Sequence, residues 1–252
     1  MKKLAIVTAL WLSAAVSGVS HAQGGPPMIT DDPGTPGDGN WEINIAATGA
    51  HRASSSVAER PLLDINYGAG SRIQLKYELP WVVARDDEGG ARSGLGNSLV
   101  GVKWRFFDAG EEGWHVSTYP QVELRNPGSH AADRGLAEEG TGVLVPLEFE
   151  RVFSGFGINF EAGKEFRSRG PGSVFGGFAL GHEFTEALEL MAELHGERAP
   201  SEGSEVAVNL GGRFALSQGT FLLSVGRDLH NRLDERASVF AYVGWQITAS
   251  AH

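Results

Sequence analysis

Residues 71–83 have the sequence SRIQLKYELPWVV, in which apolar and polar side chains alternate almost without a break. Because successive side chains of a strand point to opposite faces, this pattern predicts a strand with one apolar and one charged face. The apolar face would carry Ile73, Leu75, Tyr77, Leu79 and Trp81, and the polar face Arg72, Gln74, Lys76 and Glu78. The segment is about twice as long as an average strand of a soluble sheet, and it suits a tilted strand that crosses a bilayer.

The same alternation recurs after residue 40 and predicts about twelve strands. It is clearest in 96–107, 156–167 and 205–216, where charged residues keep to one face. The connections are by turns short and long, as in transmembrane barrels with tight turns at one rim and longer loops at the other. The sequence therefore predicts an all-β, antiparallel, up-and-down transmembrane β-barrel over residues 41–247. The expected strands are 41–50, 61–68, 71–83, 96–107, 114–124, 142–153, 156–167, 173–184, 188–198, 205–216, 220–228 and 237–247.

An even number of strands places both termini on one side of the membrane, and in bacterial outer-membrane barrels the short turns are periplasmic. Loops 84–95 and 125–141 would then face outward. Aromatic residues gather near the short turns, as an interfacial belt requires. A soluble barrel or sandwich is the alternative, but its apolar faces would need a second covering layer, of which the sequence gives little sign. The belt would contain Trp41, Trp104, Phe106, Trp114, Phe153, Phe156, Phe184, Phe214, Phe221 and Trp245.

The segments outside the barrel differ in composition. Residues 1–22 combine two lysines, a short apolar run and a small-residue cleavage site, which predicts a secretory signal peptide cleaved after Ala22. The apolar run is shorter than the roughly 20 residues of a spanning helix. Residues 23–40 are rich in Pro, Gly and Asp and predict an irregular periplasmic lead-in, either a loose leader or a small plug in the barrel mouth. Residues 248–252 would form a C-terminal tail.

Composition and motifs argue against several functions. Without Lys2 and Lys3 the chain has 19 basic and 31 acidic residues, which argues against nucleic acid as a partner. It has no cysteine, so disulfides and thiolate metal ligands are excluded. GxSxG and HExxH motifs are absent and the histidines are scattered, so no enzyme activity, catalytic residue or cofactor is expected. Asp31 and Asp32 lack a third ligand at a recognisable position, so no metal site is expected either.

Six blocks in combination resemble a known family. They are TDDPGTPGDGNWEIN (30–44), INYGAGSRIQLKYELPWVV (65–83), GLGNSLVGVKWRFF (94–107), STYPQVEL (117–124), VNLGGRFALS (208–217) and LLSVGRDL (222–229). The chain is similar to the outer-membrane β-barrel transporter family named after the MetA pathway of phenol degradation. The resemblance implies a barrel in the outer membrane of a Gram-negative bacterium and passage of small or aromatic compounds. One departure is the ending YVGWQITASAH, since many such barrels finish on an aromatic residue that helps assembly.

The inward faces hold the densest set of charged side chains. Basic residues fall on 71–83 and 96–107, and acidic residues on 142–153, 156–167 and 188–198, which predicts a transverse electric field. Two interpretations stay open: a polar lumen that sets selectivity, or a filled interior in which Lys and Arg pair with Glu. The candidate lumen-lining residues are Glu42, Asp64, Lys76, Glu78, Lys103, Arg105, Glu123, Glu148, Glu150, Glu161, Glu165, Glu193 and Arg213.

Pro80, Pro120 and Pro146 interrupt three predicted strands in their outer halves. Proline removes a donor from the sheet, so these residues predict a wall kink. The kink would either be a tolerated bulge or weaken the wall so that an apolar solute leaves sideways into the membrane.

The sequence thus predicts a porin-like outer-membrane channel or transporter that passes small solutes, possible ones being aromatic or hydrophobic compounds, by passive diffusion through a polar, charged lumen. Its partners would be outer-membrane lipid, the outer-membrane assembly machinery and a small-molecule solute. The alternative is a structural or surface-exposed barrel with a plugged lumen and outer loops that bind a partner.

Overall fold

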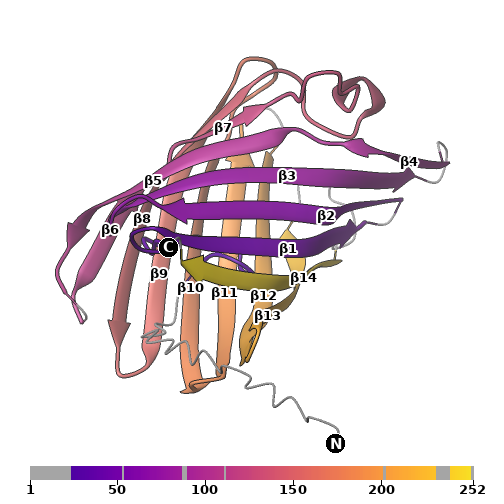
Figure 1. Cartoon of the computed structure of the whole chain (residues 1–252). Coiled ribbons are helices and arrows are strands. Elements are labelled where there is room, and N and C mark those ends of the chain that lie inside the picture. The colour runs from indigo at the N-terminus through magenta and orange to yellow at the C-terminus, as the bar shows by residue number, and fades with distance from the viewer. Residues whose placement is uncertain are drawn as a thin grey trace, which may run out of the picture.

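The computed structural model describes residues 24–52, 54–86, 90–110, 112–200, 203–230 and 239–250. The signal peptide predicted for residues 1–22 lies outside these ranges. The chain forms one antiparallel sheet that closes into a barrel (Figure 1). No helix in the described ranges is long and apolar enough to cross a membrane. The elements are β1 (Asn40–His51), β2 (Ser55–Gly68), β3 (Ile73–Asp86), β4 (Gly90–Leu95), β5 (Ser98–Asp108), β6 (Trp114–Thr118), β7 (Gln121–Leu124), the 3₁₀ turn η1 (Ala132–Arg134), β8 (Gly142–Phe153), β9 (Phe156–Arg167), β10 (Val174–Thr185), β11 (Leu188–Ala199), β12 (Gly203–Leu216), β13 (Gly219–His230) and β14 (Val239–Ser250).

The fourteen strands occupy twelve positions around the barrel. β4 and β5 both pair with β3 and are two halves of one interrupted strand. β6 and β7 both lie between β5 and β8 and are likewise two halves of one strand. β1 pairs with β14 along its whole length, which closes the sheet. The prediction of a twelve-stranded antiparallel barrel is confirmed.

Three predicted boundaries are wrong, the first being the start of the strand expected at 61–68, which begins at Ser55. Residues 84–95 were expected to form an outer loop, but β3 continues to Asp86 and pairs with β4 from Gly90 onward. Residues 90–95 carry little alternation of polarity, because this hairpin pairs through its backbone where no apolar face is needed. At the other end of the chain, β14 reaches Ser250, which pairs with Asn40, so strand replaces most of the predicted tail 248–252. Residues 251 and 252 lie outside the described ranges.

The distribution of polarity is the reverse of that in a soluble protein. Large apolar side chains face outward, with Trp104 at 54% and Leu210 at 59% exposed. Most of the large, fully buried side chains are polar or charged, among them Lys103, Glu148 and Asn159. This is the pattern of a barrel whose outer surface contacts hydrocarbon and whose interior is polar.

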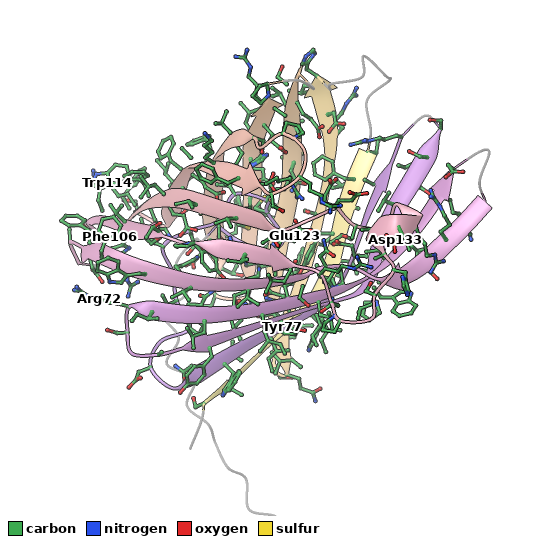
Figure 2. All side chains as sticks on the ribbon, turned by 90° about the horizontal axis from the view of Figure 1, so that it is seen from above. Arg72, Tyr77, Phe106, Trp114, Glu123 and Asp133 are labelled. Atoms are coloured by element: carbon green, nitrogen blue, oxygen red, sulfur yellow. The ribbon has the colours of Figure 1, made fainter. Side chains whose placement is uncertain are left out.

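The two ends of the barrel carry different side chains. In Figure 2, Arg72, Phe106 and Trp114 lie together at one end and Asp133 lies at the opposite end. The aromatic end is the one with the short turns, where Trp114 and Phe106 are 40% and 41% exposed. The opposite end carries the loop 125–141 that contains η1. These features are those of a periplasmic and an extracellular rim.

Candidate channel lumen

Residues 24–39, here called the lumen segment, run inside the barrel against its inner wall. Thr30 is completely buried, and Met28 and Asp32 are each 6% exposed. Tight turns such as the one from Gly25 to Met28 keep the segment compact. Its Pro, Gly and Asp content rules out a strand of its own, so its backbone groups depend on side chains of the wall.

Two glutamates of the wall bind the backbone of the lumen segment. Glu193 of β11 accepts hydrogen bonds from the N–H groups of Ile29, at 2.9 Å, and Thr30, at 2.8 Å. Glu161 of β9 accepts one from the N–H of Asp31 at 3.2 Å. Each carboxyl group offers two oxygens as acceptors, so these two side chains fix the segment's position.

Lys103 of β5 binds the same segment from another side. It is 2% exposed, and its Nζ donates to Asp31 Oδ1 at 2.9 Å and to the carbonyl of Asp32. Glu148 Oε2 lies 3.5 Å from the same Nζ. Burial acts to raise the pKa of Asp31, but the charges of Lys103 and Lys76 outweigh it and hold that pKa below its ordinary value. Asp31 therefore lies ionised against the buried ammonium.

The beginning of the lumen segment is held by β12 and β13. Arg213 donates to the carbonyl of Pro26 at 2.8 and 3.0 Å and to that of Gly24. Ser224 donates to the carbonyl of Pro27 at 2.9 Å. A guanidinium with its planar set of donors suits several carbonyls at once. The segment is thus bound by several strands from β5 round to β13.

Two glycines of the wall make room for the segment. A Cβ at Gly177 of β10 would lie 2.0 Å from Thr30 Oγ1, and one at Gly211 of β12 would lie 2.4 Å from Met28 Cε. Contacts this short require an atom to shift. At Gly177 all three nearest atoms belong to Thr30, so a larger residue there would push on the segment, whereas at Gly211 the end of the Met28 side chain can move and the Cβ would also meet Leu223 O of β13 at 2.7 Å. The wall is therefore shaped to fit it.

Three cavities border the lumen segment, and two of them lie towards opposite rims of the barrel. The cavity on the extracellular side, here called the outer cavity, has a volume of about 830 Å³, and the cavity on the periplasmic side has a volume of about 160 Å³. Both are lined by Asp64 of β2, Lys76 of β3 and Asp31 of the segment, so these residues lie between the two cavities. Lys76 Nζ lies 3.3 Å from Asp64 Oδ1 and 2.8 Å from Glu78 Oε2. The path from one cavity to the other is therefore narrow between the segment and β2–β3.

The thirteen candidate lumen-lining residues all lie on the inner face, at four places. Lys103, Glu148, Glu161, Glu193 and Arg213 surround the lumen segment. Glu42, Asp64, Lys76 and Glu78 line the cavities along β1–β3. Glu123 and Glu165 pair with Arg167 near the outer end, at 2.8 and 2.7 Å. Arg105 and Glu150 lie near the periplasmic end, where they contact Asp108 and His115 respectively.

Sequence reasoning missed part of this arrangement. Asn209 donates to Glu193 at 2.8 Å and Glu189 accepts from Arg213 at 3.3 Å. Both occupy polar positions of alternating strands, so the pattern could have identified them. The hydrogen bonds to the carbonyl groups of Gly24, Pro26 and Pro27 could not be predicted, because every residue has a carbonyl group.

The three prolines lie at interruptions of neighbouring strands. Pro80 of β3 stands beside the break between β4 and β5, and its carbonyl accepts from the N–H of Gly96 at 3.0 Å. Pro120 is at the break between β6 and β7, and its carbonyl accepts from Val102 at 3.0 Å. Pro146 of β8 accepts from the hydroxyl of Thr118 at 2.8 Å. The wall is therefore least regular between β3 and β8.

The loop 125–141 closes over this irregular region. Asn126 donates to the carbonyl of Gly96 at 2.6 Å and Ser129 to that of Leu95 at 2.7 Å. Ala131 and Leu136 pack with Val82 and Ala84 in a small apolar cluster. These contacts join the loop to the β3–β4 hairpin.

Comparison with solved structures finds bacterial outer-membrane barrels. The chain is similar to the COG4313 outer membrane channel from Pseudomonas putida F1, with a TM-score of 0.70 and 11% identity over 90% of this chain and 100% of that one. It is also similar to the NanC porin (TM-score 0.57, 5% identity) and the KdgM porin (TM-score 0.57, 13% identity), each over 83% of this chain and 100% of the other. No family model and no curated protein matches the chain. The phenol-degradation family therefore stays a prediction, while the fold of this chain is that of outer-membrane β-barrel channels and porins.

Proposed function

We propose that the protein is a bacterial outer-membrane channel for small solutes, in which the lumen segment narrows the passage. The observation that supports this most is the pair of cavities that share Asp64, Lys76 and Asp31 as lining residues. A barrel with only a structural role needs no cavities on both sides of the same three polar residues. The polar lining suits diffusion of hydrated solutes, with no cofactor and no energy source.

The narrowest part of the path sets the size of solute. Small ions and molecules of a few heavy atoms would pass with the lumen segment in place. Larger solutes would need the segment to leave the wall, which breaks its hydrogen bonds to Glu193, Lys103 and Arg213. Each hydrogen bond to a charged group contributes about 1.5–3 kcal/mol, so release of the segment would be rare without a solute that favours it.

The charge of the lining favours cationic and neutral solutes over anions. Lys103, Lys76 and Arg213 each lie within 4 Å of a carboxylate. Further carboxylates such as Glu161 and Glu193 face the lumen segment. The aromatic or hydrophobic solutes implied by the family resemblance fit this scheme only as neutral molecules.

Liposome swelling tests the proposal. Liposomes with the mature protein should swell in solutes of the size of glycine or a pentose, and more slowly as solute size increases. A variant that lacks residues 24–39 should admit larger sugars. If neither protein accelerates swelling, the alternative of a structural barrel with partner-binding loops is favoured.

A second route is suggested by the interruptions at Pro80, Pro120 and Pro146, where an apolar solute would leave the lumen sideways into the membrane. Val82 and Ala84, covered by loop 125–141, provide apolar surface at this place. Replacement of the three prolines by threonine restores ladder donors and should slow uptake of an apolar solute. Unchanged uptake in that triple variant, with normal folding, would refute the lateral route.

The proposal also includes how the protein reaches the outer membrane. Export by the predicted signal peptide and insertion by the outer-membrane assembly machinery would place the chain in the outer membrane. Membrane fractionation tests this, and recovery of the protein from the soluble periplasmic fraction would contradict it.

A further inference from the structure

Charges on the barrel wall are sorted by sign between its two faces. Every acidic residue in the described strands occupies an inner-face position, as the alternation of burial and the strand registers show. The inner-face acidic residues nearest the outer rim include Glu165, Glu197 and Glu205, which line the outer cavity. The outer face of the described strands carries basic residues instead. They are Arg60, Arg85, Arg151, Lys164, Arg198 and Arg227.

Five of these six lie in the extracellular halves of their strands. Two of them share one row of the sheet, because Val174 of β10 pairs with Lys164 of β9 on one side and with Arg198 of β11 on the other. Strands are about 4.8 Å apart, so the backbones of Lys164 and Arg198 are about 10 Å apart. Both side chains are exposed, and Val174 between them is 50% exposed. The row continues to Val145 of β8, which is 41% exposed.

The two cations of this row have no acidic partner among the described residues. Lys164 Nζ lies over the ring of Phe166, 4.8 Å from its centre. This contact aims the ammonium along the outer surface of the wall. Arg151, in the periplasmic half of β8, differs because its Nε donates to the carbonyl of Glu112 at 3.3 Å.

Charged side chains are tolerated near the membrane–water interface, but this tolerance does not explain why those on the outer face are all basic. On the lipid-facing surface of a barrel, acidic side chains cost less than Arg or Lys, and the cost of either falls toward the rims. Tolerance alone would therefore admit acidic residues at the outer rim of a chain that has more acidic than basic residues. Selection for cations points to an anionic group at that level.

We propose that Lys164 and Arg198 form a site on the outer wall that binds the phosphate groups of a phosphorylated outer-leaflet lipid. A guanidinium binds phosphate with two parallel hydrogen bonds, and an ammonium adds a point charge beside it. Val174 and Val145 would contact the first carbons of the acyl chains. The site does not depend on transport through the lumen.

The test uses the full mature protein, purified in a zwitterionic detergent and titrated with lipid A as the probe. Binding of lipid A with its two phosphates is compared with binding of the same lipid after dephosphorylation, by native mass spectrometry or a fluorescence titration. The variant replaces Lys164 and Arg198 with glutamine, and Arg151→Gln is the matched control from the periplasmic half. Heat-modifiable migration in SDS gels shows whether each variant is folded.

We expect the double variant to bind phosphorylated lipid A about 30-fold more weakly, since each basic residue near a lipid surface contributes about 1 kcal/mol. The Arg151→Gln control should bind as the wild type does. Dephosphorylation should weaken binding to the wild type and leave the double variant unchanged. Equal binding of the two lipids by the wild type, or equal losses in the double variant and the control, would overturn the proposal.

Discussion

The contact between Lys103 and the lumen segment gives the sharpest test of how the lumen is closed. Lys103 is 2% exposed and lies against Asp31, the carbonyl of Asp32, and Glu148. Lys103→Met keeps most of the side-chain volume and removes the charge. The fully buried Glu148 and the partly exposed Asp31 then have no ammonium between them, and removing one partner of a buried ion pair costs about 3–5 kcal/mol, of which the lower end applies here.

Only states with the lumen segment bound to the wall bear this cost in full, because Asp31 returns to water when the segment leaves. With about 1.4 kcal/mol for each factor of ten, a cost near 3 kcal/mol raises the population of the released state about 100-fold. The released state can be measured by thiol labelling, since the chain has no cysteine. Thr30→Cys would place the only thiol of the chain at a position that is 0% exposed.

In the Thr30→Cys background, Lys103→Met should therefore raise the rate of maleimide labelling about 100-fold if labelling follows the opening equilibrium. Lys164→Met removes a lysine from the outer wall and is the matched control, with no change expected. An equal labelling rate with and without Lys103, in folded protein, would refute the reasoning that this lysine holds the segment.

Three further predictions concern the same lumen. Gly177→Val would place side-chain atoms within 2.0 Å of Thr30 Oγ1 and should raise single-channel conductance by expelling the segment. Gly196→Val is the control, because its Cβ meets its nearest neighbour at 3.5 Å, and it should leave conductance unchanged. Equal conductance of the two variants would contradict the fit described for Gly177. Asp64→Asn at the constriction should lower the cation-to-anion permeability ratio about fivefold, the effect of about 1 kcal/mol between charges at close range in water, and an unchanged reversal potential would place the constriction elsewhere. The pKa of Asp31 is lowered from its ordinary value of 3.8, so its pairing with Lys103 stabilises the closed state above that pH and is lost as the pH falls through the lower value. Any rise in conductance caused by Asp31 should then appear only below about pH 4 and be absent from Asp31→Asn, and a rise below pH 4 that persists in Asp31→Asn would exclude Asp31 as its cause.

The strand pattern was predictable because a membrane barrel imposes it on every strand. Alternation in 71–83 and 156–167 follows directly from hydrocarbon on one face and a polar interior on the other. Residues 84–95 were not predictable, since above the membrane a hairpin needs only backbone pairing. The interruptions at Gly96 and Pro120 divide two strands, yet the polarity pattern runs through them and hides the division.

The sequence predicted which side chains face the barrel interior, but not which groups those side chains bind. Alternation placed Lys103, Glu161 and Glu193 in the interior. It could not show that these side chains bind backbone groups of residues 24–39, because those bonds involve N–H and carbonyl groups that every residue has. Gly177 and Gly211 are residues of the wall whose type hints that the segment packs against them, but a glycine in a strand also occurs at bulges and bends.

Single-channel recording of the mature protein, with and without residues 24–39, tests the central claim most directly. If the lumen segment narrows a channel, the wild type should show small conductance steps, and the deletion variant should show steps several times larger with weaker ion selectivity. Absence of conductance in both proteins, after folding has been shown by heat-modifiable migration, would contradict the claim that this barrel is a channel.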